Sequence, residues 1–489
     1  MNSFVNPQKP LSKAESKNPR MLKLSLGVEN MMQEMAKINV GSSSNTQPST
    51  ARLIPRKTQA VEQQVSTAKH NPESVSKLIK PPSCKRHEGI AAISCTPREA
   101  LEQRGSLLSA FEKEEILGYD CIYYVADCRK VPTNPKSPNQ GFDDDNGDYR
   151  VMVDDHIAYR YQVLHELGRG SFGQVSKAVD HKSKELVALK IIKNRKKFHE
   201  QALIEVDILK KLRENDLCGT HHVVKILEHF FFRNHMVIAF ELHGINLYEL
   251  CKANRFAPLP GTTIRIFAIQ LLSTLSYLHS LRIVHCDLKP ENILLRKNSK
   301  THIQVIDFGS SCYEQKKLYT YIQSRFYRAP EVMLGIPYTT AIDMWSFGCI
   351  LAELANGYPI FPGESEGEQM LCIMEFLGVP PWSLIEKAPR RKNFFDSHCN
   401  PIMAPNSRGK MRRVNSKDIS AFLRSALKDS DAAAMISFIQ RCLEWDPVKR
   451  WSPTEAMEHP WFSGTGQLAS LILPKIHVSG KHNQMDVVR

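Results

Sequence analysis

The stretch that decides the fold is His285-Cys286-Asp287-Leu288-Lys289-Pro290-Glu291-Asn292, and it is followed by Asp307-Phe308-Gly309. Asp287 can accept a proton from a hydroxyl group, and Lys289 brings a positive charge two residues later. Asn292 and Asp307 are oxygen ligands of the kind that Mg²⁺ accepts. These are the parts that phosphoryl transfer needs, because its transition state mainly requires an aligned nucleophile and neutralised phosphate oxygens.

The residues around this stretch support that interpretation. The apolar run 264–279 before it predicts a helix, and residues 303–306 predict a strand that leads into Asp307. For a His-x-Asp triplet alone, an ordinary surface loop would be the better interpretation. The full octet between a helix and a strand favours a catalytic loop.

At these residues the chain resembles the eukaryotic protein kinases. The ending Lys289-Pro290-Glu291-Asn292 is similar to that of the serine/threonine-directed members, whereas Cys286 replaces the more common Arg. The resemblance implies an α+β, two-lobed fold, with an antiparallel sheet and one helix in the N-lobe and a mostly helical C-lobe. It also implies ATP and Mg²⁺ as cofactors, with Mn²⁺ as an alternative metal.

Composition narrows the class of protein. The 489 residues carry a net charge of +14 and twelve cysteines without Cys-x-x-Cys spacing, which argues against a disulfide framework and a structural zinc site. No apolar run reaches the roughly 18 residues that span a bilayer, and no base-stacking motif accompanies the basic residues, so neither a membrane nor a nucleic acid is an expected partner. We expect a monomeric, cytoplasmic protein. Basic clusters at 52–57 and 77–86 are either nuclear import signals or a solvated tail.

The chain divides into segments of different composition. Residues 1–95 are polar and basic and are expected to be disordered. Residues 96–154 are expected to form an ordered accessory segment, with a helix over 97–111 and a strand-like run over 112–127. A kinase domain is expected over 155–463, with its N-lobe at 155–243, its C-lobe at 244–463 and an insert at about 378–428. A flexible tail follows at 464–489.

A glycine-rich hairpin is the first predicted nucleotide contact, because only glycine lets backbone amides approach phosphates closely. The pattern Gly-x-Gly-x-x-Gly alone also fits a dinucleotide fold, but the strand 187–190 that follows favours a kinase. Lys190 needs a carboxylate partner, for which Glu205 is the first choice and Glu200 the alternative. The hairpin residues are Leu167, Gly168, Arg169, Gly170, Ser171, Phe172, Gly173, Gln174 and Val175.

The strand 237–243 is expected to end where the two lobes join. The backbone of Glu241, Leu242 and His243 would meet the adenine edge, and Asn246 would reach the ribose. Phe240 would close the rear of the nucleotide pocket. A plain buried strand end would explain Phe240, but not the polar turn after it.

The loop after Asp307 gives the narrower resemblance. Tyr319-Thr320-Tyr321, together with Asp155-His156 and Ser310-Ser311-Cys312, resembles the dual-specificity tyrosine-phosphorylation-regulated kinases, and the ordered lead-in resembles their second class. The resemblance covers roughly residues 96–465. It implies that Tyr321 is phosphorylated by the kinase itself, and that protein substrates are then modified on Ser or Thr followed by Pro. The alternative is a pseudokinase-like scaffold, which would be expected to lack Lys190, Asp287 or Asp307.

Charge patterning predicts how the modified loop is held. Arg325 and Arg328 lie four and seven residues after Tyr321, and they can clamp a phosphate that Cys286 cannot pair with. The family prefers an Arg upstream of the target residue, for which Glu291 is the expected partner.

Three further pairs are predicted. Asp343 should hold the backbone of the catalytic loop, and Glu331 should pair with Arg450. Cys286 and Cys312 either approach within disulfide range on oxidation or are inert buried thiols.

Overall fold

The computed structural model describes residues 94–317, 319–424 and 432–463. The chain divides into two compact units, residues 1–125 and 126–489. The predicted disorder of residues 1–93, both basic clusters and the predicted tail lie outside the described residues. The segment expected at 96–154 contributes to both units.

In the first unit, the expected helix is divided in two, α2 Pro97–Arg104 and α3 Ala110–Glu115, with 3-10 turns at Gly105–Leu107 and Ile116–Gly118. The expected helix is interrupted at Ser109, which caps the start of α3. The Ser109 hydroxyl accepts from Glu112 N (3.2 Å), while the Glu112 carboxylate accepts from Ser109 N (2.9 Å). The prediction of a strand-like run over 112–127 is wrong, since residues up to 118 are helical and residues 119–127 form no strand. Within the described part of this unit, β-type pairing is limited to Cys95 and Ile122.

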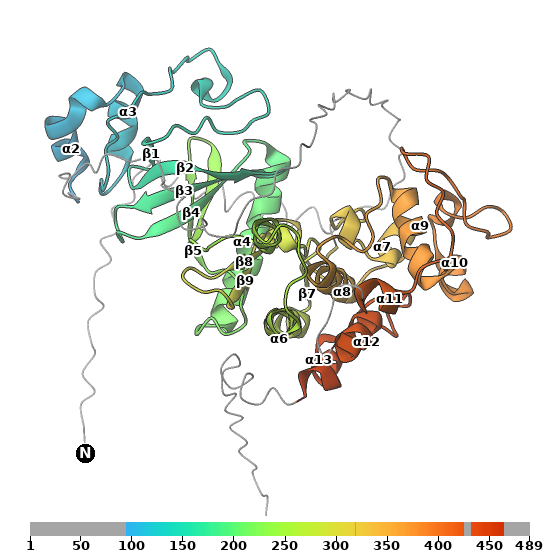
Figure 1. The fold of residues 1–489 in the computed structure, drawn as a ribbon. Coiled ribbons are helices and arrows are strands. Elements are labelled where there is room, and N and C mark those ends of the chain that lie inside the picture. Colours follow the sequence, from blue (N-terminus) through green and yellow to red (C-terminus); the bar gives the residue numbers. More distant parts are fainter. Residues whose placement is uncertain (1–93, 318, 425–431, 464–489) are drawn as a thin grey trace, which may run out of the picture. The chain divides into compact units, whose positions relative to one another are not determined.

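The second unit contains an antiparallel sheet of six strands in the order β1-β2-β3-β4-β6-β5 (Figure 1). Helix α4 Lys196–Asn215 packs on β4, β5 and β6 through a face that includes Val206, Leu209 and Leu212. One helix on a twisted sheet matches the expected N-lobe. The strands are β1 His156–Ile157, β2 Tyr161–Arg169, β3 Gly173–Asp180, β4 Leu186–Ile192, β5 Ile226–Phe232 and β6 His235–Glu241.

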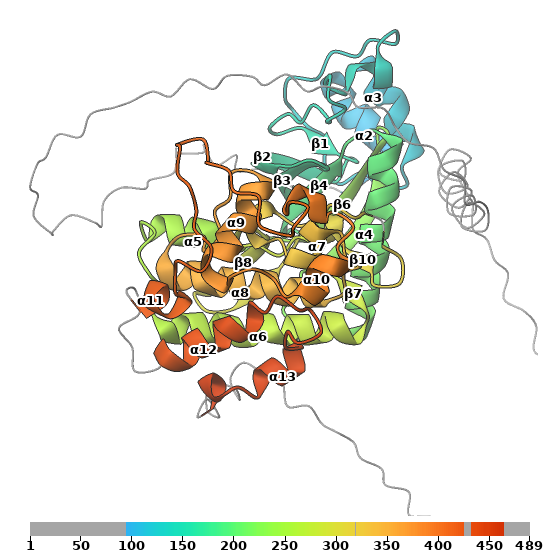
Figure 2. The same ribbon diagram turned by 90° about the vertical axis from the view of Figure 1, so that its right-hand side faces the viewer.

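The rest of this unit is mainly helical, as expected for the C-lobe. Helix α8 is buried from Ile342 to Ala355, and it packs against α6 and α12, while α13 packs on α6 (Figure 2). No helix among the described residues combines the length and apolar character that crossing a membrane requires. The helices are α5 Leu247–Ala253, α6 Gly261–Ser280, α7 Pro330–Leu334, α8 Ala341–Asn356, α9 Glu366–Leu377, α10 Trp382–Lys387, α11 Ile419–Arg424, α12 Ala432–Cys442 and α13 Pro453–Met457.

Two short antiparallel ladders bracket the catalytic stretch. Strand β7 Ile283–Val284 pairs with β10 Cys312–Tyr313, and β8 Ile293–Leu295 pairs with β9 Ile303–Val305. The octet 285–292 therefore connects two paired strands, and Asp307 follows a third. This arrangement brings two motifs that are about 20 residues apart to the same place.

Candidate active site

Buried hydrogen bonds fix the catalytic loop. Asp343 on α8 accepts from the backbone N–H of His285 (2.7 Å) and of Cys286 (3.1 Å), so the expected contact is present. The His285 ring donates from Nε2 to Ile306 O (3.0 Å) and accepts at Nδ1 from Asp287 N (3.2 Å). His285 thereby ties the loop to the strand that precedes Asp307.

Two residues of this region have left-handed backbone conformations without being glycine. Cys286 has φ +66° and Asp307 has φ +62°. Such conformations cost roughly 1–3 kcal/mol and persist only where the surroundings impose them. They turn the chain beside Asp287 and at Asp307, the two carboxylates assigned to chemistry.

Polar groups surround the Asp287 side chain. One carboxylate oxygen accepts from Lys289 Nζ (2.7 Å), and the other from the Ser324 hydroxyl (2.7 Å) and backbone N–H (2.9 Å). Lys289 also donates to the Ser324 hydroxyl (3.0 Å), and Asn292 donates to Asp287 O (2.9 Å). The sequence analysis assigned no role to Ser324, which is 37 residues from Asp287 in the chain.

A second charged group lies around Lys190. Its ammonium donates to both carboxylate oxygens of Glu205 (2.7 and 2.9 Å) and to Asp307 (2.8 Å), so Glu205 rather than Glu200 is the helix partner. Burial opposes ionisation of Asp307, but the nearby ammonium outweighs it and lowers the pKa of this carboxyl to about 2. Asp307 is therefore an anion at neutral pH, as a metal ligand should be.

The glycine-rich hairpin joins β2 to β3. The backbone closes through Gly170 N to Gly173 O (2.8 Å), and Gly168 pairs with Val175. A Cβ atom on Gly173 would lie 2.1 Å from Ile191 O, which requires glycine there. Glycine at this position therefore lets the start of β3 lie close against β4.

A cavity of about 610 Å³ collects most of the predicted nucleotide residues. Such a volume is in the range of small-molecule sites. Ala188, Val224 and Leu294 also line it and were not predicted, because their apolar side chains carry no motif. The predicted lining residues are Leu167, Gly168, Arg169, Gly170, Ser171, Phe172, Gly173, Val175, Lys190, Glu205, Phe240, Glu241, Leu242, His243, Asn246, Asp287, Lys289, Asn292 and Asp307.

Two predicted contacts need correction in detail. Gln174 is not among the residues that line the cavity, since alternation along β3 turns its buried side chain the other way, where it donates to Tyr149 O. Asn246 lines the cavity, but its side-chain oxygen also caps α5 by accepting from Glu249 N (2.7 Å).

The activation loop places the predicted tyrosine beside one of its predicted arginines. Tyr321 is 56% exposed, and the Arg328 guanidinium lies 4.0 Å from its ring centre. Arg328 also donates to Ile322 O, while Arg325 donates to Glu364 O (2.6 Å). Both arginines are near the loop, and an exposed Tyr321 hydroxyl is accessible for modification.

A buried acidic residue was missed by the sequence analysis. Glu353 on α8 is 5% exposed, and it accepts from the Tyr327 hydroxyl (2.6 Å). Burial raises the pKa of Glu353 to about 7, the Tyr327 hydroxyl bond opposes this shift, and the nearby Glu291 adds to it. The signal in the sequence was a second carboxylate, besides Asp343, within the apolar helix 341–356.

Two other predicted pairs are present. Arg450 donates to both carboxylate oxygens of Glu331 (2.7 and 3.0 Å), and both side chains are almost fully buried. The sulfur atoms of Cys286 and Cys312 lie 3.8 Å apart, and both residues are buried. Whether peroxide joins these sulfurs stays a prediction.

Comparison with known proteins agrees with this geometry. The protein kinase domain model matches residues 161–462, more than half of the chain. A 371-residue stretch is 50% identical to dual specificity tyrosine-phosphorylation-regulated kinase 4 of Homo sapiens, covering 76% of this chain and 70% of the relative. The chain belongs to the dual-specificity tyrosine-phosphorylation-regulated kinase family. It is a protein kinase, so the predicted α+β, two-lobed fold is confirmed.

Other members of the family are similar to a comparable degree. Kinase 2 of Drosophila melanogaster is 48% identical over 369 residues, covering 74% of this chain and 50% of the relative. Kinase 3 of Rattus norvegicus is 48% identical over 386 residues, covering 75% and 65%. The chain thus spans between half and 70% of the length of these relatives. The insert residues 390–397 and 408–410 resemble those of the fourth member, which is among the relatives that match.

Kinases of this family use ATP with a divalent metal ion, and the residues present suit such an ion. The Asp307 carboxylate is ionised, and it lines the same cavity as Asn292. Asn292 uses its amide nitrogen to hold the Asp287 carbonyl, so that its amide oxygen is the atom suited to a metal ion. Hard cations such as Mg²⁺ prefer oxygen ligands of this kind.

Proposed function

We propose that the chain is a dual-specificity protein kinase that phosphorylates its own Tyr321 and then transfers the γ-phosphate of ATP to Ser or Thr of protein substrates. The observation that carries the proposal is the convergence of two charged groups on one cavity. One group is Lys190 with Glu205 and Asp307, and the other is Asp287 with Lys289 and Asn292.

In the proposed reaction, Asp287 accepts the hydrogen bond of the attacking hydroxyl and then its proton. The Ser324 hydroxyl, which donates to the same carboxylate, keeps that carboxylate oriented. Lys289 neutralises the phosphoryl group in transfer, and Lys190 holds the first phosphates of ATP. A bound Mg²⁺, for which Mn²⁺ could substitute, supplies charge neutralisation on the outer phosphates through Asp307 and Asn292.

The remaining assignments are proposals of the same kind. The hairpin 167–175 covers the phosphates, the backbone at 241–243 meets adenine, and Asn246 reaches the ribose. After phosphorylation, Tyr321 is held by Arg325 and Arg328, because each guanidinium can donate two bonds to a phosphate. The Arg328 contact with the Tyr321 ring supports this role.

We further infer a preference for Ser or Thr followed by Pro, with Arg upstream. Glu291 and Glu353 support the second part, because they form a pair of carboxylates near the catalytic loop. The enzyme acts as a monomer without a nucleic acid. We propose a cytoplasmic location, and the basic clusters at 52–57 and 77–86 are the feature that supports entry to the nucleus. A fluorescent fusion in which these clusters are neutralised tests that location.

The experiment that tests the reaction compares freshly expressed protein with Asp287→Asn by mass spectrometry. Phosphate on Tyr321 in the first protein and none in the second is the expected result. Phosphate on Tyr321 in both proteins would assign the tyrosine to another enzyme. No activity of phosphorylated protein on any Ser-Pro or Thr-Pro peptide would leave the scaffold alternative, which no observation at present favours.

A further inference from the structure

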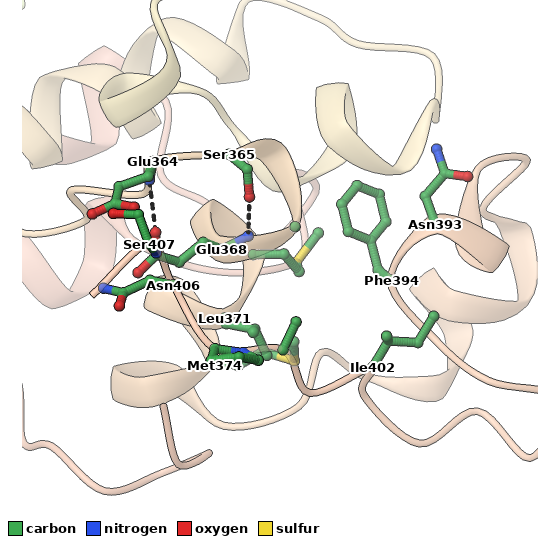
Figure 3. Close-up of a pocket in the computed structure, with 14 residues that line it drawn as sticks. Glu364, Ser365, Glu368, Leu371, Met374, Asn393, Phe394, Ile402, Asn406 and Ser407 are labelled. Atoms are coloured by element: carbon green, nitrogen blue, oxygen red, sulfur yellow. Dashed lines mark hydrogen bonds between the residues drawn. The ribbon is translucent and has the colours of Figure 1, made fainter. Parts of the chain in front are cut away.

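A second hollow, of about 520 Å³, lies between helix α9 and residues 393–407 of the insert (Figure 3). Leu371 and Met374 come from the helix, while Phe394 and Ile402 lie at one end of the hollow. Ile402 is 45% exposed, so this apolar end is open to solvent. An open apolar groove of this size can take the large side chains of a ligand.

The opposite end of the groove is polar, but its groups already have partners. Glu364 accepts from the backbone N–H of Ser407 (3.0 Å), and the Ser365 hydroxyl accepts from Glu368 N (3.1 Å) (Figure 3). Hydrogen bonds from Ser407 lower the pKa of Glu364, and Arg408 acts in the same direction. The carboxylate at this end is therefore balanced by groups of the protein.

The insert segment that lines one side of the groove carries excess positive charge. Residues 387–413 contain eight Lys and Arg and a single acidic residue, Asp396. Two of the arginines are used internally, since Arg390 pairs with Glu366 and Arg412 pairs with Glu368 and Glu375. The six others are exposed: Lys387, Arg391, Lys392, Arg408, Lys410 and Arg413.

These basic residues are next to the lining of the groove in the chain. Arg391 and Lys392 precede the lining residue Asn393, and Arg408 follows Ser407 at the other end. Apolar lining next to exposed basic residues of the insert is complementary to a ligand whose large apolar side chains have acidic neighbours. We propose that this groove docks a segment of another protein in which one or two large apolar side chains are flanked by Asp or Glu.

The chain itself is a poor source of such a segment. Residues 1–93 contain fourteen Lys and Arg against six Asp and Glu, and residues 464–489 contain three against one. A second copy would present the same basic insert segment on a chain of net charge +14. Like charges across an interface disfavour both arrangements.

Residues 363–364, at the polar end of the groove, contact Arg325 in the loop that follows Asp307. The carbonyl of Glu364, whose side chain lines the groove, accepts from Arg325 Nη1 (2.6 Å). Gly363 also accepts from Arg325 (3.4 Å), and its own N–H donates to Gln369 on α9. A protein docked in the groove is thereby held beside the loop that contains Tyr321.

A binding experiment with the full-length chain tests the proposal independently of catalysis. The probe is a fluorescein-labelled peptide, Asp-Asp-Glu-Leu-Gly-Phe-Glu-Asp-Asp, which has no hydroxyl to phosphorylate. We expect saturable binding by fluorescence anisotropy that weakens as salt is raised. The double variant Arg408→Glu, Lys410→Glu should weaken binding about tenfold or more, and Ile402→Ser several-fold.

Matched controls separate the groove from overall charge. Lys297→Glu, Lys300→Glu changes the net charge equally at an exposed loop, and Val448→Ser removes an apolar side chain that is 90% exposed. Both should bind within about twofold of the parent chain. Thermal unfolding of each variant verifies its fold.

Several results would overturn the docking proposal. They are absence of saturable binding, equal binding by the groove and control variants, and equal binding of a peptide whose acidic ends are replaced by Lys or by Gly. Self-association that Ile402→Ser abolishes, without peptide binding, would assign the groove to a second copy of the chain. Because the probe cannot be phosphorylated, none of these results bears on the proposed kinase activity.

Discussion

The protonation state of Glu353 should change the preference of the kinase for peptides that carry an Arg upstream of the target residue. Its pKa of about 7 means that the ionised fraction rises from about one tenth at pH 6 to about nine tenths at pH 8. In the proposed recognition of an upstream Arg, the ionised form of Glu353 adds its negative charge to that of the nearby Glu291. The ratio of kcat/KM for a peptide with that Arg to one with Ala should therefore increase with pH over this range.

Glu353→Gln provides the control for that pH dependence. The glutamine keeps the shape and can still accept from Tyr327, but it does not titrate. The ratio should then be smaller and nearly flat between pH 6 and pH 8. An unchanged rise with pH in this variant would exclude Glu353 as its source.

Cys286 and Cys312 are expected to form a disulfide when the protein is oxidised. Burial raises the pKa of the Cys286 thiol, whereas its hydrogen bond to Cys312 lowers the pKa of the latter. Cys312 is therefore the better thiolate, and its sulfur should attack peroxide first to give the sulfenic acid and one water. The Cys286 thiol would then displace water from the resulting sulfenic acid, so that two thiols and one peroxide give a disulfide and two waters.

Closing the 3.8 Å gap to a bond of about 2.05 Å would shift the catalytic loop beside Asp287. We expect peroxide to remove most activity, dithiothreitol to restore it, and Cys312→Ser to be insensitive. Cys218→Ser, at an exposed cysteine, should remain sensitive. Persistent inactivation of Cys312→Ser by peroxide would refute the switch.

Among the helices and strands, α7 is held by the buried ion pair between its Glu331 and Arg450, which should contribute measurably to the free energy of unfolding. Arg450→Met leaves the buried Glu331 carboxylate without its charged partner, a change that typically costs about 3–5 kcal/mol. The free energy of unfolding in urea measures this cost. Arg282→Met removes an exposed partner of Glu314 and should cost about 1 kcal/mol or less. Equal losses in the two variants would show that burial of the Arg450 pair adds nothing.

Elements also explain how far the sequence could predict the site. The catalytic octet, Lys190 and Asp307 each lie within a short motif with its own chemistry, so their roles could be proposed in advance. Ser324 and Glu353 contact Asp287 and Tyr327 only because folding joins separate elements. Gln174 was misplaced because a motif names neighbours in the chain, whereas alternation along β3 decides which side chains face the cavity.

In the accessory region 96–154, too, local motifs could be predicted from the sequence, whereas contacts between distant residues could not. The capping box between Ser109 and Glu112 starts a helix, as its sequence indicates. The Tyr and Ile residues after 118 suggested a strand, but among them only Ile122 has a β-bridge, to Cys95. A strand also needs a partner, which sequence periodicity does not supply. Local capping signals were therefore better guides here than β propensity.

At the scale of the whole domain, nucleotide and metal should stabilise the N-lobe and C-lobe together, because residues of both line the 610 Å³ cavity. A ligand at a hundred times its Kd adds about 2.7 kcal/mol to the free energy of unfolding. For a domain of this size, that corresponds to an increase in Tm of roughly 5 °C. A non-hydrolysable ATP analogue with MgCl₂ should produce this shift, and EDTA should reduce it.

Asp307→Asn separates the metal from the nucleotide in that measurement. Asparagine keeps an oxygen but loses the negative charge that attracts Mg²⁺ and pairs with Lys190. The analogue should still raise Tm through the hairpin and the strand end at 240–243, but adding MgCl₂ should no longer increase the shift. If MgCl₂ increases the Tm shift of Asp307→Asn as much as that of the parent chain, the metal must bind to other ligands. If MgCl₂ adds nothing in Asp307→Asn, while the analogue in EDTA raises Tm normally, Asp307 is supported as a metal ligand.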